Sequence, residues 1–153
     1  MGTIDLTEVA LRLFLAVAIA AALGWERERH GKPAGLRTHM LVSLGSAAFM
    51  LATIEPCQSD LAGIGNVRLD PVRTVAGVVG GIGFLGAGSI FQSRGSVEGI
   101  TTAAGIWIMG AIGVACGAGY YVIAGLTAAM ALFVVGFVGW LALKFGHGAR
   151  HAG

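Results

Sequence analysis

We expect the other segments of the chain to be arranged around Pro71 to Phe91, PVRTVAGVVGGIGFLGAGSIF. At about 1.5 Å of rise per residue, a helix of this length crosses the hydrocarbon core of a bilayer. Glycine is a poor helix former in water, where each one costs roughly 1 kcal/mol relative to alanine. In lipid, however, small residues let helices approach closely and gain van der Waals contact. The stretch therefore predicts a transmembrane helix that packs against other helices.

A helical projection of this stretch separates small residues from bulky ones. At about 100° per residue, one side carries small residues and is interrupted mainly by Phe84, while Val75, Val78 and Ile82 lie on the other. We interpret the segment as a central helix whose small face presses on its neighbours. A substrate path is the alternative interpretation of the same face. The candidate packing or partner-binding residues are Gly77, Gly80, Gly81, Gly83, Gly86 and Gly88.

The composition indicates a polytopic membrane protein. Of the 153 residues, 56% are hydrophobic and 12% are charged, whereas a soluble domain carries about 25% charged residues. We predict an all-α bundle of about five transmembrane helices, in a single domain over residues 1–153. The expected spans are residues 7–25, 38–54, 71–91, 100–117 and 120–143.

Basic residues set the expected orientation of this bundle. If the loop after the first span is cytoplasmic, that side carries seven of the ten basic residues, which is the bias found in cytoplasmic loops. We therefore expect the N-terminus outside and the C-terminus in the cytoplasm. Asp5 and Glu8 precede the first span where a signal peptide would carry basic residues, so we expect this helix to be retained.

Several polar residues are expected to meet at the cytoplasmic ends of the helices. We predict a loop over residues 26–39, with Thr38 capping the second span. Helix starts would favour an anion or an acidic partner there. The alternative is a solvated band of charge that topology alone requires. His39 fits a hydrogen-bonded boundary residue, and a proton carrier is the alternative. The cluster comprises Glu26, Arg27, Arg37, Thr38, His39, Thr101 and Thr102.

The opposite side of the membrane carries the start of the third span. Asp70 is placed to cap this helix, and Arg73 lies close enough in sequence to pair with it. Asp60 and Asp70 are candidates for holding a hydrated divalent cation. Cys57 and Cys116 are expected on this same side, and whether they form a disulfide stays open.

Signals of catalysis are absent from the sequence. There is no HExxH motif, no P-loop lysine and no serine set in a triad motif. The formal GxGxxG at residues 81–86 lacks a preceding strand and a later acidic residue, so it does not indicate a nucleotide site. We expect no enzymatic activity, no cofactor and no nucleic-acid partner. No acidic residue lies near the middle of an expected span, which argues against an ion pump or coupled transporter.

Four blocks of the sequence are informative in their order: Trp25–Arg29 with Gly35–Val42, Asp70–Arg73, Gly81–Gly88, and Gly99–Trp107. Together they resemble the MgtC/SapB family over about residues 9–143. The resemblance implies a bacterial inner-membrane protein of about five spans. The best-known members are virulence factors that support growth in low magnesium, and they are thought to restrain the F-type ATP synthase. We expect the short form of the family, without the C-terminal ACT-like domain.

Two functions follow as hypotheses. The first is a regulatory protein that docks on another membrane complex through small-residue helix faces, and the resemblance implies the ATP synthase as that complex. The alternative is a small oligomeric channel or transporter for magnesium or another ion. Exposed glycine and alanine faces also self-associate, so a homodimer is a further expectation.

Overall fold

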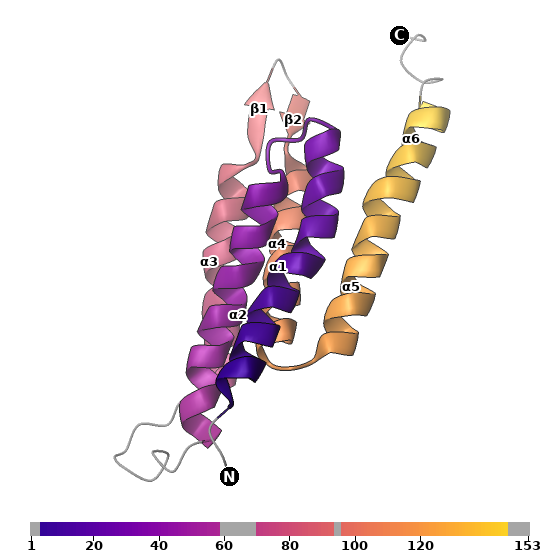
Figure 1. Cartoon of the computed structure of the whole chain (residues 1–153). Coiled ribbons are helices and arrows are strands. Elements are labelled where there is room, and N and C mark those ends of the chain that lie inside the picture. The colour runs from indigo at the N-terminus through magenta and orange to yellow at the C-terminus, as the bar shows by residue number, and fades with distance from the viewer. Residues whose placement is uncertain (1–3, 59–69, 94–95, 147–153) are drawn as a thin grey trace.

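The computed structural model describes residues 4–58, 70–93 and 96–146 as a bundle of long helices (Figure 1). A short antiparallel hairpin, β1 (Phe91–Ser93) and β2 (Ser96–Glu98), stands at one end. Within these residues, five helical stretches are long and apolar enough to cross a membrane, which agrees with the predicted bundle of membrane helices. The predicted orientation stays a prediction. The helices are α1 (Leu6–Arg29), α2 (Leu36–Gln58), α3 (Pro71–Gly88), α4 (Ile100–Gly117), α5 (Tyr121–Phe133) and α6 (Gly139–Gly146), and the π-helical η2 (Val134–Val138) joins the last two.

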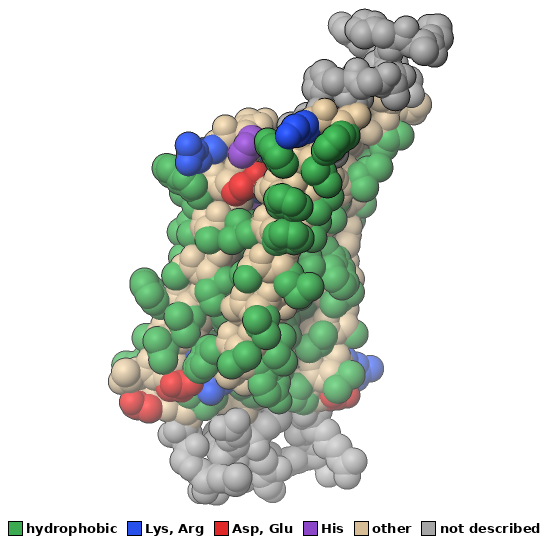
Figure 2. All heavy atoms as spheres, turned by 90° about the vertical axis from the view of Figure 1, so that its right-hand side faces the viewer, with side chains coloured by type: hydrophobic (Ala, Val, Ile, Leu, Met, Phe, Trp, Pro, Cys, Tyr) green, Lys and Arg blue, Asp and Glu red, His purple; other side chains and the backbone are tan. Residues whose placement is uncertain are grey.

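The outer surface fits a lipid environment. Figure 2 shows hydrophobic side chains over the middle of the visible face, with charged side chains toward its two ends. Large apolar residues such as Phe14, Phe49 and Phe84 are exposed on the helices. A soluble protein of this size would bury most of such surface, whereas lipid solvates it without cost.

Helix α4 is the centre of the bundle, packing against α1, α2, α3 and α5. Its glycines make that position possible. A methyl group at Gly113 would overlap the carbonyl of Ser43 on α2, and one at Gly117 would lie 2.6 Å from the carbonyl oxygen of Ala47. The matched four-residue spacing of small residues on both helices brings the two backbones into direct contact.

Helix α3 lies at the edge of the bundle, so the prediction of a central third helix is wrong. Its buried residues are Ile82 and Gly86, and Gly86 packs against Ala103 of α4. Ile82 reaches the backbone of Gly110, where a methyl group would overlap it. The face of α3 that points into the bundle therefore carries mainly bulky side chains. It can do so because Gly110 of α4 leaves space for Ile82. Methyl groups added at Gly77, Gly80, Gly81, Gly83 or Gly88 would meet no atom of the described chain within 4 Å.

The predicted loop over residues 26–39 is present but shorter, because its two ends are helical. Helix α1 continues to Arg29, and α2 already begins at Leu36, so the connection covers residues 30–35. The predicted cap at Thr38 is wrong, because this residue lies inside α2. The carboxylate of Glu28 accepts the N–H of Leu36 at 2.6 Å and so satisfies the start of α2 from the preceding helix.

The other predicted spans agree with the structure to differing degrees. The fourth span is confirmed at Ile100–Gly117. Helix α2 extends to Gln58, four residues beyond its predicted end. Helix α3 stops at Gly88, before the predicted residue 91, because the following residues pair in the hairpin. The fifth span continues through η2 and α6 to Gly146.

The end of the molecule opposite the hairpin is fixed by Arg12 of α1. Its Nε donates to the Glu8 carboxylate at 2.8 Å, and its Nη1 donates to the carbonyl of Gly117 at 2.9 Å. The hydroxyl of Tyr121 donates to the same Glu8 oxygen. Arg12 therefore satisfies a carbonyl at the end of α4 and ties α1 to the α4–α5 turn. That turn uses Gly119 at φ +82°, a conformation that favours glycine.

Candidate functional site

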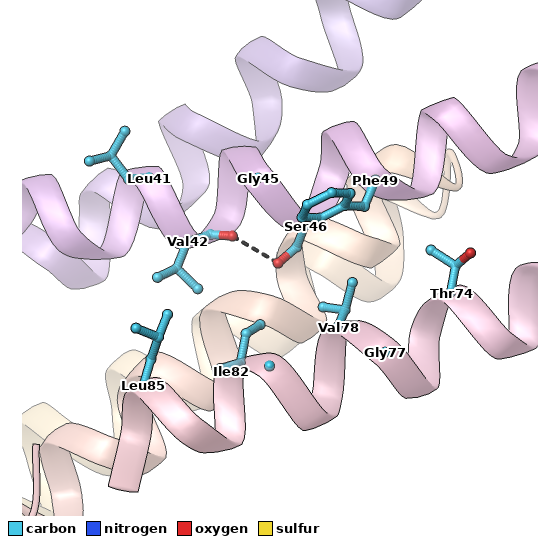
Figure 3. A pocket seen from close by; sticks show the side chains of 11 residues that line it. Leu41, Val42, Gly45, Ser46, Phe49, Thr74, Gly77, Val78, Ile82 and Leu85 are labelled. Atoms are coloured by element: carbon cyan, nitrogen blue, oxygen red, sulfur yellow. Dashed lines mark hydrogen bonds between the residues drawn. The ribbon is translucent and has the colours of Figure 1, made fainter. Parts of the chain in front are cut away.

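A groove of about 690 Å³ opens along the surface between α2 and α3 (Figure 3). Figure 3 shows Leu41 and Leu85 toward one end of this α2–α3 groove, and Phe49 and Thr74 toward the other. Most of the lining is aliphatic or aromatic, so an occupant must be apolar as well. The lining residues are Leu41, Val42, Gly45, Ser46 and Phe49 of α2 and Thr74, Gly77, Val78, Gly81, Ile82 and Leu85 of α3.

Missing side chains create much of this groove. Methyl groups at Gly45, Gly77 or Gly81 would have no neighbour within 4 Å among the described residues. Val78 and Ile82 belong to a small buried cluster with Ile106 of α4 and so form the floor. The backbones of α2 and α3 therefore flank an open surface groove, and a third helix could pack closely against both of them there.

The hydroxyl groups of the groove already have hydrogen-bond partners. Ser46 donates to the carbonyl of Val42 at 2.8 Å, as Figure 3 shows. The hydroxyls of Thr74 and Thr53 lie 2.8 Å apart and bond to each other across α3 and α2. A polar solute would find little to bind here, whereas an apolar helix or chain would leave no buried polar group without a partner.

The predicted packing glycines of α3 fall into two groups. Gly77 and Gly81 line the α2–α3 groove, and Gly80, Gly83 and Gly88 are exposed beside it. Gly86 alone of the six is buried against α4. Partner binding by the exposed glycines stays a prediction.

A second constellation, the polar hub, consists of Glu26, Arg27, His39 and Thr102, where α1, α2 and α4 meet. Arg27 is buried, with 4% of its surface exposed, and its Nη2 donates to the hydroxyl of Thr102 at 3.1 Å. His39 is fully buried, and its Nδ1 lies 2.8 Å from the carbonyl oxygen of Gly35. Glu26 faces His30 at the surface, with 3.1 Å between Oε1 and Nδ1.

Gly24 explains why this hub is buried. A methyl group there would lie 2.8 Å from the Cα of Leu36 and 3.1 Å from the Cβ of His39. The bare backbone therefore lets α1 and α2 touch, which encloses Arg27 one turn further on. Sequence reasoning did not single out Gly24. Gly24 lies three residues before Arg27, near the end of α1, and so shares a helix face with it. This spacing is the sequence signal that identifies Gly24 as a contact position.

The remaining members of the predicted polar cluster lie outside the hub. Thr101 is exposed on α4. Arg37 and Thr38 are exposed on α2 and line a small polar depression of about 240 Å³ together with Glu28 and Lys32. Of the predicted cluster, the polar hub therefore contains Glu26, Arg27, His39 and Thr102, which lie where α1, α2 and α4 meet.

The candidates on the opposite side are only partly within the described residues. Asp70 caps α3 as predicted, accepting the N–H of Val72 at 2.9 Å. The expected ion pair between Asp70 and Arg73 is not present. The structure describes both residues, and the ion pairs of its described part are Arg12–Glu8 and His30–Glu26. Cys116 is a buried free thiol, while Asp60 and the side chain of Cys57 lie outside the described residues. In the part of the chain that is described, no group of three or more His, Cys, Asp or Glu is placed to hold a metal ion.

Comparison with known proteins gives consistent matches. The family model described as "MgtC family" matches residues 13–143. The chain is 43% identical over 128 residues to "Putative magnesium transporter YhiD" of Escherichia coli K12, covering 84% of this chain and 59% of that protein. It is 33% identical over 140 residues to "Protein SapB" of Bacillus subtilis 168, covering 91% and 60%. It is 39% identical over 114 residues to "Protein MgtC" of Brucella abortus 2308, covering 74% and 44%. No solved structure matches.

Proposed function

The chain belongs to the MgtC family, and from this premise we propose that it is a regulatory membrane protein that docks on another membrane protein. The docking surface is the α2–α3 groove, and its occupant is a transmembrane helix of the partner. The observation that carries the proposal is that the glycines of α3 in this groove, Gly77 and Gly81, have no neighbour in the described chain. The proposal assigns the chain no enzymatic reaction.

The chemistry of the groove favours a helix in lipid as occupant. Between helices in a bilayer there is little hydrophobic driving force, so association depends on close backbone contact at small residues. Gly77 and Gly81 are four residues apart and offer such a contact. The hydroxyls of Ser46 and Thr74 already have hydrogen-bond partners, so they need no polar group from the partner helix. A helix with an apolar face and small residues of its own is the complementary occupant.

The likeness to the MgtC/SapB family makes the F-type ATP synthase the first partner to test, since the best-known members are thought to restrain it. We place the chain in the bacterial inner membrane with the hairpin end in the cytoplasm. Arg27, Arg29, Lys32 and Arg37 are at that end, which supports this orientation by the positive-inside rule.

Photocrosslinking in native membranes tests the docking proposal. A photoreactive residue at Leu85 is used, because this position lines the groove. It is combined with Gly81→Leu or with the control Gly125→Leu on α5, since neither position has a neighbour within 4 Å among the described residues. We expect the crosslinked partner to disappear with Gly81→Leu and to persist with Gly125→Leu. Equal yields in both variants, or crosslinks only between two copies of this chain, would contradict docking on another protein.

Magnesium transport is the second candidate, and the printed name of the Escherichia coli relative favours it. It would use a pore formed by an oligomer of the chain. Magnesium flux into liposomes that contain the pure protein separates the two functions. Under docking, we expect flux equal to that of empty vesicles under the same gradient. A flux that rises with protein content would replace the docking proposal with transport.

A further inference from the structure

We propose that the polar hub binds one water molecule, held between α1, α2 and α4 by Glu26, Arg27 and His39. Each of these residues has a buried atom without a hydrogen-bond partner in the described chain. The three atoms are Glu26 Oε2, Arg27 Nε and His39 Nε2. Buried polar atoms in proteins are nearly always bonded to protein or to ordered water. Three such atoms at one helix junction therefore point to a ligand.

The hydrogen-bonding capacities of the three atoms define that ligand. A carbonyl oxygen only accepts, so the contact with Gly35 places a proton on Nδ1 of His39. In the neutral ring, Nε2 is then an acceptor, as is Glu26 Oε2, whereas Arg27 Nε carries a donor hydrogen. The ligand must donate twice and accept once. Water has two donor hydrogens and two acceptor lone pairs, and buried waters typically make about three hydrogen bonds.

Charge at the hub favours a neutral ligand. Glu26 and Arg27 carry opposite formal charges, so an ion of either sign would be attracted by one residue and repelled by the other. A neutral molecule that both donates and accepts hydrogen bonds avoids this repulsion.

Gly105 of α4 leaves room for such a molecule. A methyl group at this buried position would lie 3.4 Å from Nε2 of His39 and would meet no other atom of a neighbouring helix within 4 Å. The position beside the imidazole nitrogen therefore accepts one added carbon, and such a carbon would lie against Nε2. Arg27 contacts Thr102, one turn earlier on the same face of α4.

The hub lies close to the protein surface. The side chain of Glu26 is 19% exposed, and that of its partner His30 is 62% exposed. Oε1 of Glu26 lies 3.1 Å from Nδ1 of His30, whereas Oε2 is buried. The Glu26 side chain therefore links the buried atoms of the hub with the surface.

Water-edited solid-state NMR of histidine-labelled protein in lipid bilayers tests the proposal. The His39 signal is assigned by its loss in His39→Gln. We expect transfer of magnetisation from water protons to Nε2 of His39, with Nε2 unprotonated. Gly105→Ala places a methyl group against Nε2 and should reduce this transfer several-fold. Gly125→Ala, an exposed glycine with no neighbour among the described residues, should leave it unchanged.

Three results would overturn the water site. Wild-type protein without water transfer to Nε2 would show that the hub is dry. A protonated Nε2 would indicate a direct bond to Glu26 instead. Unchanged transfer in Gly105→Ala would place the water elsewhere. The first two results come from the wild-type protein, so the test stands even if Gly105→Ala fails to fold, and none of them bears on docking at the α2–α3 groove.

Discussion

Helices α3 and α4 are both rich in glycine, yet they use it in opposite ways. The glycines of α4 face inward and let α2 and α3 reach its backbone, as at Gly110 and Gly113. Those of α3 face mainly outward, with Gly77 and Gly81 open to the membrane. Glycine in a membrane helix marks a place where another backbone or side chain can approach. Whether that neighbour belongs to the same chain depends on the partner surface and not on the glycine itself.

The comparison predicts its largest effect at Gly113. Leucine there would collide with the Ser43 carbonyl, a backbone atom that cannot move aside without separating α2 from α4. We expect Gly113→Leu to prevent stable folding, exceeding the roughly 1–3 kcal/mol usual for an overpacked core. Yield of monodisperse protein and SDS-induced loss of helicity measure this. Gly125→Leu is the control, and equal stability of the two variants would refute the inward role of the α4 glycines.

Ile82 carries the next largest effect, because it is the α3 side chain that fills the space over Gly110. Ile82→Ala leaves a cavity between α3 and α4 and should lower the free energy of unfolding by about 2 kcal/mol or more. Val79→Ala on the exposed part of the same helix removes two carbons outside the bundle and should change little. Unfolding in mixed micelles compares the two, and a similar loss in both would mean that α3 is not anchored by its bulky face.

Arg12 tests whether polar contacts, as well as glycine, fix α4 at the end opposite the hairpin. Arg12→Met keeps the length of the side chain but removes its hydrogen bonds to Glu8 and Gly117. We expect a loss of about 1.5–3 kcal/mol in the free energy of unfolding, the usual range for a hydrogen bond with a charged group. Arg73→Met, at an exposed position on α3, is the control. No difference between them would show that the Arg12 contacts add nothing to stability.

How much of this could be predicted from the sequence depends on whether the deciding contact is local. The existence of five spans follows from apolar runs, and the ends of α4 match because Gly99 and Gly119 interrupt the chain on either side. The end of α1 was missed because Arg27 is held in the helix by Thr102, which is far away in sequence. The sequence correctly separates a small-residue face of α3 from a bulky one. Which of the two faces the bundle depends on Gly110 of α4, which receives Ile82.

The same limit applies to the candidate site. The residues Glu26, Arg27, His39 and Thr102 could be assigned to one membrane face from helix ends alone. The burial of Arg27 and His39 could not, because it follows from contact of α1 and α2 at Gly24. The α2–α3 groove likewise arises from Gly45 on one helix facing Gly77 and Gly81 on another. A projection of one helix cannot contain such a pairing.

The smallest expected effect on stability sharpens the comparison most. Gly81→Leu on α3 adds four carbons at a position with no neighbour in the described chain. It also replaces glycine, a weak helix former, with leucine, a strong one, so we expect the free energy of unfolding to rise by less than about 1 kcal/mol. The same unfolding assay that detects Gly113→Leu makes this measurement in the purified protein. A large destabilisation would mean that the outward face of α3 is packed within the monomer or against a second copy, and the contrast between α3 and α4 would then be wrong. If Gly81→Leu preserves stability and abolishes the crosslink in native membranes, Gly81 contacts a partner protein and is not required for the fold of its own chain.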